Sequence, residues 1–101
     1  MLEFQPTDEF GAGCLQGYLA VTYARLVEVF GEPNSGNDGY KTDAEWTIKF
    51  PDCTIASIYN YKDGKNYEGA DGLAVEDITE WHIGGKTKKS LTYIKQVLQE
   101  N

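Results

Sequence analysis

The sequence predicts an α+β domain, in which an antiparallel sheet of three to four strands carries two amphipathic helices on one face in the order β-α-β-β-β-α. Apolar and polar residues alternate over residues 44–50 and again over 78–83, which is the period of a half-buried strand. Apolar residues recur every three to four positions over 23–30 and 91–98, which is the period of an amphipathic helix. Because a strand pair alone is marginal in water, the helices are expected to cover the apolar face of the sheet.

The 101 residues suffice for one domain, which is predicted to span residues 18–101 after a loose N-terminal arm at residues 1–17. Three glycines interrupt any regular pattern in this arm. Residues 18–21 are predicted to form a short strand. Thr22 is a good N-cap for a helix over residues 23–30, and Gly31 is placed to end it.

The centre of the predicted sheet is a hairpin with arms at residues 44–50 and 53–61. In the first arm, the apolar residues share one face, and the other face carries Glu45, Thr47 and Lys49. Pro51 and Asp52 break the alternation between the arms. An Asp-Gly pair would be expected in such a turn, but Asp52 is followed by Cys53, which leaves the turn type open.

The third central strand is predicted at residues 78–83, followed by a turn at Gly84 and Gly85. Thr87 can cap a final helix, whose apolar stripe contains Leu91, Ile94, Val97 and Leu98. Trp46 and Trp81 are the expected anchors of the core.

The chain carries a formal charge of −7, and this charge is unevenly distributed. Residues 1–80 hold 15 of the 16 acidic residues and five of the nine basic ones, a balance of −10, whereas residues 81–101 hold four basic residues and one acidic residue, a balance of +3. Direct binding to nucleic acid is not expected, because such binding needs Lys and Arg against phosphates. An acidic body can attract a basic protein surface, or it can serve solubility alone.

The sequence gives no sign of a membrane or secreted protein, because it lacks a long apolar run and an N-terminal secretory pattern. A cytoplasmic location is therefore expected. Cys14 and Cys53 are expected to be free thiols in that compartment, although one bridge between them stays open. With a single histidine, His82, a structural zinc site would need carboxylate ligands, and no EF-hand spacing occurs. No metal or cofactor is expected.

The candidate partner-binding surface combines acids and tyrosines from the hairpin and the connection that follows it. Tyrosine offers contact area and a hydrogen bond at low entropic cost. Glu45 is expected to be exposed. The predicted residues are Asp43, Glu45, Tyr59, Tyr61, Asp63, Tyr67, Glu68 and Asp71.

Two alternatives use other residues. An anion such as a phosphate or a nucleotide could bind at the start of the last helix through Gly85, Lys86, Thr87 and Lys88, although the glycine required at the first position of a P-loop is absent. His82 could act as an acid–base group with Cys14 or Cys53. No nucleophile has a recognisable spacing from His82, so the chain is not expected to be an enzyme.

Several motifs together resemble those of small phage- or prophage-encoded accessory proteins of this length. They are Phe30-Gly31-Glu32-Pro33, Trp46 in an alternating strand, Ile58-Tyr59-Asn60-Tyr61-Lys62, and Trp81-His82-Ile83-Gly84-Gly85 before a closing helix. The resemblance implies an inhibitor of host defence, of the anti-CRISPR type. Such a protein, a monomer or homodimer in the host cytoplasm, would use an acidic, DNA-mimicking surface to block a host protein that binds nucleic acid through a basic surface.

Overall fold

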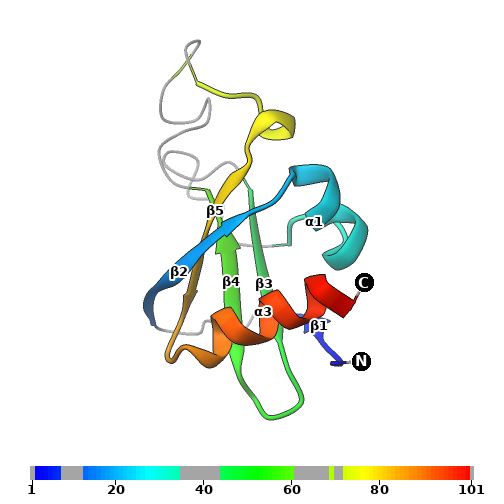
Figure 1. Cartoon of the computed structure of the whole chain (residues 1–101), viewed down its shortest axis with the longest axis vertical. Helices are drawn as coiled ribbons and strands as arrows, with labels where there is room; N and C mark the ends of the chain where they lie inside the picture. Colours follow the sequence, from blue (N-terminus) through cyan, green and yellow to red (C-terminus); the bar gives the residue numbers. More distant parts are fainter. Residues whose placement is uncertain (1, 8–12, 35–43, 61–68, 70–71, 101) are drawn as a thin grey trace.

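The computed structural model of the chain describes residues 2–7, 13–34, 44–60, 69 and 72–100 (Figure 1). Within these ranges, five strands form one antiparallel sheet in the order β1-β3-β4-β5-β2. The strands are β1 (Gln5–Pro6), β2 (Cys14–Ala20), β3 (Glu45–Lys49), β4 (Ile55–Tyr59) and β5 (Glu80–Gly85). The helices are α1 (Tyr23–Phe30), the 3-10 turn η2 (Val75–Asp77) and α3 (Lys89–Glu100). The α+β class is confirmed, with one strand more than the sequence predicted.

The N-terminal segment belongs to the sheet, so the predicted loose arm is wrong for its described part. Strand β1 pairs with β3, and β2 begins at Cys14, four residues before the predicted start. The two described glycines of this segment make close contacts. A Cβ atom on Gly13 would lie 2.3 Å from the carbonyl carbon of Gly85, and one on Gly17 would lie 2.6 Å from Leu91 Cδ2. Residues 8–12 lie outside the described ranges.

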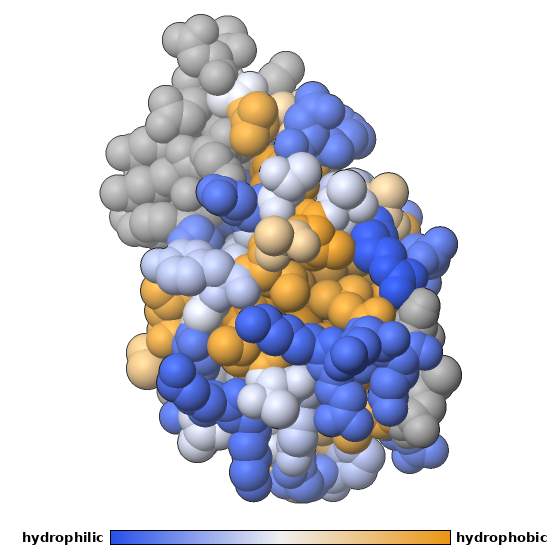
Figure 2. Space-filling model, viewed as in Figure 1, coloured by the Kyte–Doolittle hydropathy of each residue, from blue (hydrophilic) through white to orange (hydrophobic). Residues whose placement is uncertain are grey.

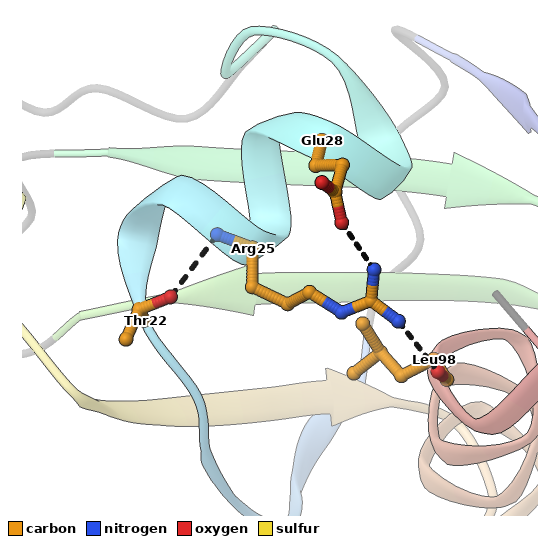
Figure 3. A network of polar contacts seen from close by, with 4 residues as sticks. All are labelled: Thr22, Arg25, Glu28 and Leu98. Atoms are coloured by element: carbon orange, nitrogen blue, oxygen red, sulfur yellow. Dashed lines mark hydrogen bonds and ion pairs between the residues drawn. The ribbon is translucent and has the colours of Figure 1, made fainter.

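Helix α1 has the predicted bounds, because both of its ends are fixed locally. The Thr22 Oγ1 atom accepts a hydrogen bond from the backbone nitrogen of Arg25 at 3.1 Å. Gly31 has φ 82° and donates its N–H to the Val27 oxygen at 2.8 Å. Figure 3 shows how Arg25 also joins α1 to α3: its guanidinium pairs with Glu28 and donates to the Leu98 oxygen at 3.0 Å.

The two tryptophans are fully buried, as predicted, and each is bonded to one end of α1. Trp46 Nε1 donates to the Gly31 oxygen at 2.7 Å, and Trp81 Nε1 donates to the Val21 oxygen at 3.0 Å. Their rings meet edge to face with centroids 5.4 Å apart. The core therefore positions the helix by direct hydrogen bonds as well as by packing.

The hairpin of β3 and β4 forms as predicted, with arms slightly shorter than expected. Phe50 N donates to the Thr54 oxygen, and Cys53 N donates to the Phe50 oxygen, each at 2.9 Å. Cys53 has φ 72°. This is the geometry of a three-residue loop that ends in a left-handed residue, the position usually taken by glycine.

The turn predicted at Gly84 and Gly85 is wrong, because both residues belong to β5. A Cβ atom on Gly85 would lie 2.0 Å from Ser90 Oγ, and this hydroxyl donates to the Ile55 oxygen at 2.9 Å. Gly85 thus lets the start of α3 pack directly onto the sheet. The strand also begins at Glu80, after Ile78, which is buried next to η2.

Both helices cover the same face of the sheet. Leu26 and Phe30 of α1 and Ile94 and Val97 of α3 are buried with the inward residues of the strands. Figure 1 views the molecule from the side of α3, and Figure 2 shows hydrophilic side chains over the lower part of this side and hydrophobic atoms gathered in its middle.

The two ends of the described chain meet. Leu2 N donates to Glu100 Oε1 at 2.9 Å, although 98 positions separate them. None of the described helices has the length and apolar character needed to span a bilayer.

Candidate protein-binding face

The face of the sheet turned away from α1 and α3, here called the outer face, carries one row of side chains across four strands. Glu45 of β3 pairs with Tyr59 of β4, Tyr59 pairs with His82 of β5, and His82 pairs with Tyr18 of β2. Because paired residues of neighbouring strands point to the same face, these four side chains form a continuous line, here called the outer row. Two of its members, Glu45 and Tyr59, belong to the predicted partner-binding set.

Aromatic contacts hold the outer row in order. The rings of Tyr59 and His82 are stacked, with centroids 5.4 Å apart and an interplanar angle of 17°. The ring of Tyr18 meets His82 edge to face at 5.0 Å. Gly84 lies next to Tyr59: a Cβ atom there would be 3.4 Å from Tyr59 Cε1, an ordinary van der Waals distance. The imidazole therefore lies between two tyrosines, and all three rings are preorganised.

The outer row is most exposed at the sheet edge. Glu45, Tyr59 and His82 are half-buried, whereas Tyr18 is 64% exposed. The expectation that Glu45 is exposed is therefore corrected: it is half-buried, and its side chain lies beside Tyr59, the residue with which it pairs. Leu15 of β2 pairs with Gly84 and is 44% exposed, so it adds apolar surface on the outer face.

Among the described residues, Glu80 is the acidic side chain that lies beside the exposed end of the outer row. Glu80 pairs with Ala20, next to the pair of Tyr18 and His82, and it is exposed. Glu76 and Asp77 of η2 are also exposed, but they lie three to four residues before this strand, where η2 contacts α1. The other predicted binding residues lie outside the described ranges, namely Asp43, Tyr61, Asp63, Tyr67, Glu68 and Asp71.

Tyr18 is absent from the predicted binding residues, and His82 was predicted only as a possible acid–base group. Alternation along each strand identifies which side chains share a face, but it does not identify which strands are neighbours. The position of β2 beside β5 brings Tyr18 to His82, from 64 positions away. The sequence did contain one signal for Tyr18, namely that it lies in an uncharged stretch with the pattern of a strand.

The residues predicted for anion binding surround the start of α3, where the first N–H groups have partners within the chain. Thr87 Oγ1 accepts from Lys89 N at 3.2 Å, and the Thr87 oxygen accepts from Ser90 N at 3.2 Å. Lys86, Thr87 and Lys88 are exposed, and Gly85 is buried against Ser90. Capping and packing account for Thr87 and Gly85 without a ligand.

The possible cysteine–histidine arrangements do not converge. Cys14 pairs with Gly85, three residues along β5 from His82, which is roughly 10 Å at the rise of a strand. Cys53 precedes Tyr59, the partner of His82, by six residues, which is roughly 20 Å. Both thiols are free and exposed. No group of three or more potential metal ligands occurs among the residues that the structure describes.

Asp52 in the hairpin turn accepts hydrogen bonds from two directions. The carboxylate is bonded to the Thr54 side chain and backbone and to Tyr93 Oη, the last at 2.8 Å. These hydrogen bonds lower the pKa of Asp52 from 3.8 to about 2, and the bond from the Thr54 side chain has the largest effect. The same bond raises the pKa of Tyr93. This contact ties α3 to the hairpin and lies away from the outer row.

An open groove of about 820 Å³ lies between the N-terminal segment and the hairpin turn. Its wall is mainly apolar, and it also includes Glu3, Lys49 and the exposed Cys53. None of the residues of the outer row lines it.

Comparison with known proteins gives no match: no family model matches the chain, and neither does any curated protein or solved structure. The features that indicate a function are therefore the geometry of the outer face and the charge of the chain.

Proposed function

We propose that the chain is a non-catalytic protein-binding module that contacts a basic partner surface through its outer face. The carrying observation is the outer row, in which Tyr18, His82 and Tyr59 are locked together by ring contacts and Tyr18 is largely exposed. Aromatic residues that are already ordered lose little entropy on binding, which is why they are common at the centre of interfaces.

The charge of the chain indicates the chemistry of the partner. Glu80 lies beside the aromatic residues, and residues 1–80 have a balance of −10. Carboxylates in this setting favour a surface rich in Lys and Arg and speed its encounter with the chain. A protein whose basic surface normally binds nucleic acid fits this description, and the carboxylates would then take the place of phosphates. The phage origin and the role as a host-defence inhibitor, including the anti-CRISPR type, remain proposals from the resemblance described above.

The test compares three immobilised proteins in the same bacterial lysate: the wild type, the double variant Tyr18→Ala/Glu80→Lys, and the control Glu32→Lys. Glu32 is an exposed acid after α1, so the control introduces the same type of charge reversal away from the outer row. We expect the wild type and the control to retain basic nucleic-acid-binding proteins at low salt. The double variant should lose them, and circular dichroism should show that all three proteins are folded.

Competition identifies which surface of the partner is bound. A DNA duplex added to the wild-type resin should release the retained proteins, because DNA and the chain would compete for the same basic residues. Equal retention by the double variant and the wild type, or retention that duplex DNA does not reduce, would contradict the proposal.

A further inference from the structure

The two edges of the sheet are built differently. Strand β1 has two residues, one of which is Pro6, which has no N–H to donate to a further strand. Strand β2 has seven residues, and residues 13–21 contain neither a proline nor a charged side chain. Natural proteins usually protect long edge strands with such residues. The β1 edge is therefore closed to pairing with a further strand, whereas the β2 edge has neither a proline nor a charged residue to prevent such pairing.

The backbone of the second half of β2 is available for hydrogen bonding. Val21 N donates to the Thr79 oxygen, so the alternation of an antiparallel ladder turns the backbone groups of Leu19 toward β5 and those of Tyr18 and Ala20 outward. Within the described part of the chain, β5 is the only strand beside β2. The single irregularity of β2, a register shift between Leu15 and Gly17, lies before this half.

We propose that the β2 edge pairs with the β2 edge of a second copy of this chain, as an antiparallel two-fold dimer. The absence of charge in residues 13–21 argues for this occupant: in an antiparallel two-fold pair the residue at the axis faces its own copy and every other residue faces another residue of the same strand, so no pairing opposes like charges. Antiparallel self-pairing is also isologous, so it closes at two copies. The two sheets would then form one continuous sheet, and the outer rows of both copies would meet at Tyr18.

The dimer has a distinctive dependence on salt. Each copy carries a charge of −7, so the copies repel one another, and salt should strengthen their association by screening this repulsion. Binding to a basic partner should weaken with salt instead. The dimer does not depend on the proposed function, and the two fail in different experiments. A single strand edge is small beside the roughly 1,200–2,000 Å² of stable interfaces, so we expect association only at high protein concentration.

Sedimentation equilibrium across a concentration series, at low and high salt, tests the proposal on the purified chain. We expect a monomer–dimer equilibrium that shifts toward the dimer with salt. Ala20→Pro removes an outward N–H without removing a donor to β5, and Tyr18→Lys introduces a charge at the edge. Each should weaken dimerisation at least tenfold, while the melting temperature confirms that the variant is folded.

Leu73→Lys is the matched control, since Leu73 is also an exposed apolar residue, 46% accessible, and lies outside β2. This variant changes the net charge as Tyr18→Lys does, and it should dimerise like the wild type. A wild type that stays monomeric at high concentration and high salt overturns the proposal and leaves the edge to a strand of another protein. Equal weakening by Leu73→Lys and Tyr18→Lys also overturns it, because charge alone would then explain the effect.

Discussion

At the scale of single residues, Cys53 stands out because it adopts a left-handed backbone, with φ 72°, at a position that favours glycine. An L-residue pays roughly 1–2 kcal/mol for this conformation, whereas glycine adopts it freely but loses more backbone entropy on folding. The loop between β3 and β4 thus retains its shape despite an unfavourable residue.

Cys53→Gly should therefore stabilise the chain by about 0.5–1 kcal/mol, the difference between these two effects. Cys14→Gly is the natural control, because Cys14 is also exposed but lies in the extended strand β2. It should destabilise the chain by about 0.5–1 kcal/mol. Urea unfolding of the two variants measures both changes, and a change of the same sign in both would contradict this account of the turn.

The contact between Asp52 and Tyr93 makes stability depend on pH at the acid end. The pKa of Asp52 is lowered from 3.8 to about 2 in the folded chain, so its stabilisation is complete above the unfolded value and is lost as the pH falls through the folded one. Tyr93→Phe should raise the pKa of Asp52 only part of the way to 3.8, because the bonds from Thr54 remain.

An NMR titration of the Asp52 carboxyl carbon measures this pKa directly. In parallel, the stability difference between the wild type and Tyr93→Phe should be largest above pH 3.8 and should narrow toward pH 2. An Asp52 pKa that is the same in both proteins would show that Tyr93 does not stabilise the carboxylate.

At the scale of elements, helix α1 is held at both ends by indole hydrogen bonds from the sheet. Eight residues are few for an isolated helix in water, so tertiary contacts must supply most of its stability. Trp46 bonds to Gly31 after the helix, and Trp81 bonds to Val21 before it.

Trp46→Phe and Trp81→Phe should each destabilise the chain by about 1–3 kcal/mol, since each leaves a partly buried carbonyl without its donor. Trp46→Ala should cost more, about 3–5 kcal/mol, because it also creates a cavity. Hydrogen exchange distinguishes the two effects: in the Phe variants, the amides of α1 should lose more protection than those of β3 and β4. Ile48→Val is a core change in β3 that should cost about 0.5–1.5 kcal/mol. It should reduce the protection of the α1 amides and of the β3 and β4 amides to the same extent.

The elements that could be predicted from the sequence are those whose signals are local. Helix α1 has its N-cap, its apolar stripe and its final glycine within ten residues, and the alternation in β3 correctly separates Trp46 from Glu45. Strand β1 is too short to have a period. The start of β2 could not be predicted, because Gly13 and Gly17 look like strand breakers in the sequence. Their reason is tertiary: they allow close contact with Gly85 and Leu91, which are distant in sequence. The same holds for the outer row, since the pairing of β2 with β5 is a tertiary property.

At the scale of the whole molecule, the acidic charge and the aromatic outer face would contribute to partner binding in different ways. The charge acts at long range and is screened by salt, whereas the contacts of Tyr18, His82 and Tyr59 act only after encounter. Variants of Glu80 should therefore alter mainly the rate of association with a basic partner, and variants of Tyr18 mainly the rate of dissociation. Surface plasmon resonance with an identified partner separates the two rates, and the reverse assignment would contradict this division.

The hydrogen bond between Leu2 and Glu100 has a consequence for chain connectivity. Because Leu2 and Glu100 lie side by side, the described part of the polypeptide nearly forms a ring, and the position at which that ring is cut is not dictated by the packing. A circular permutant with its termini joined by a short Gly-Ser linker, and opened at the exposed turn beside Asp52, should keep the strand order β1-β3-β4-β5-β2. A native-like amide NMR spectrum would verify this, and it would mean that the order in which the strands are synthesised is separable from the architecture that they build.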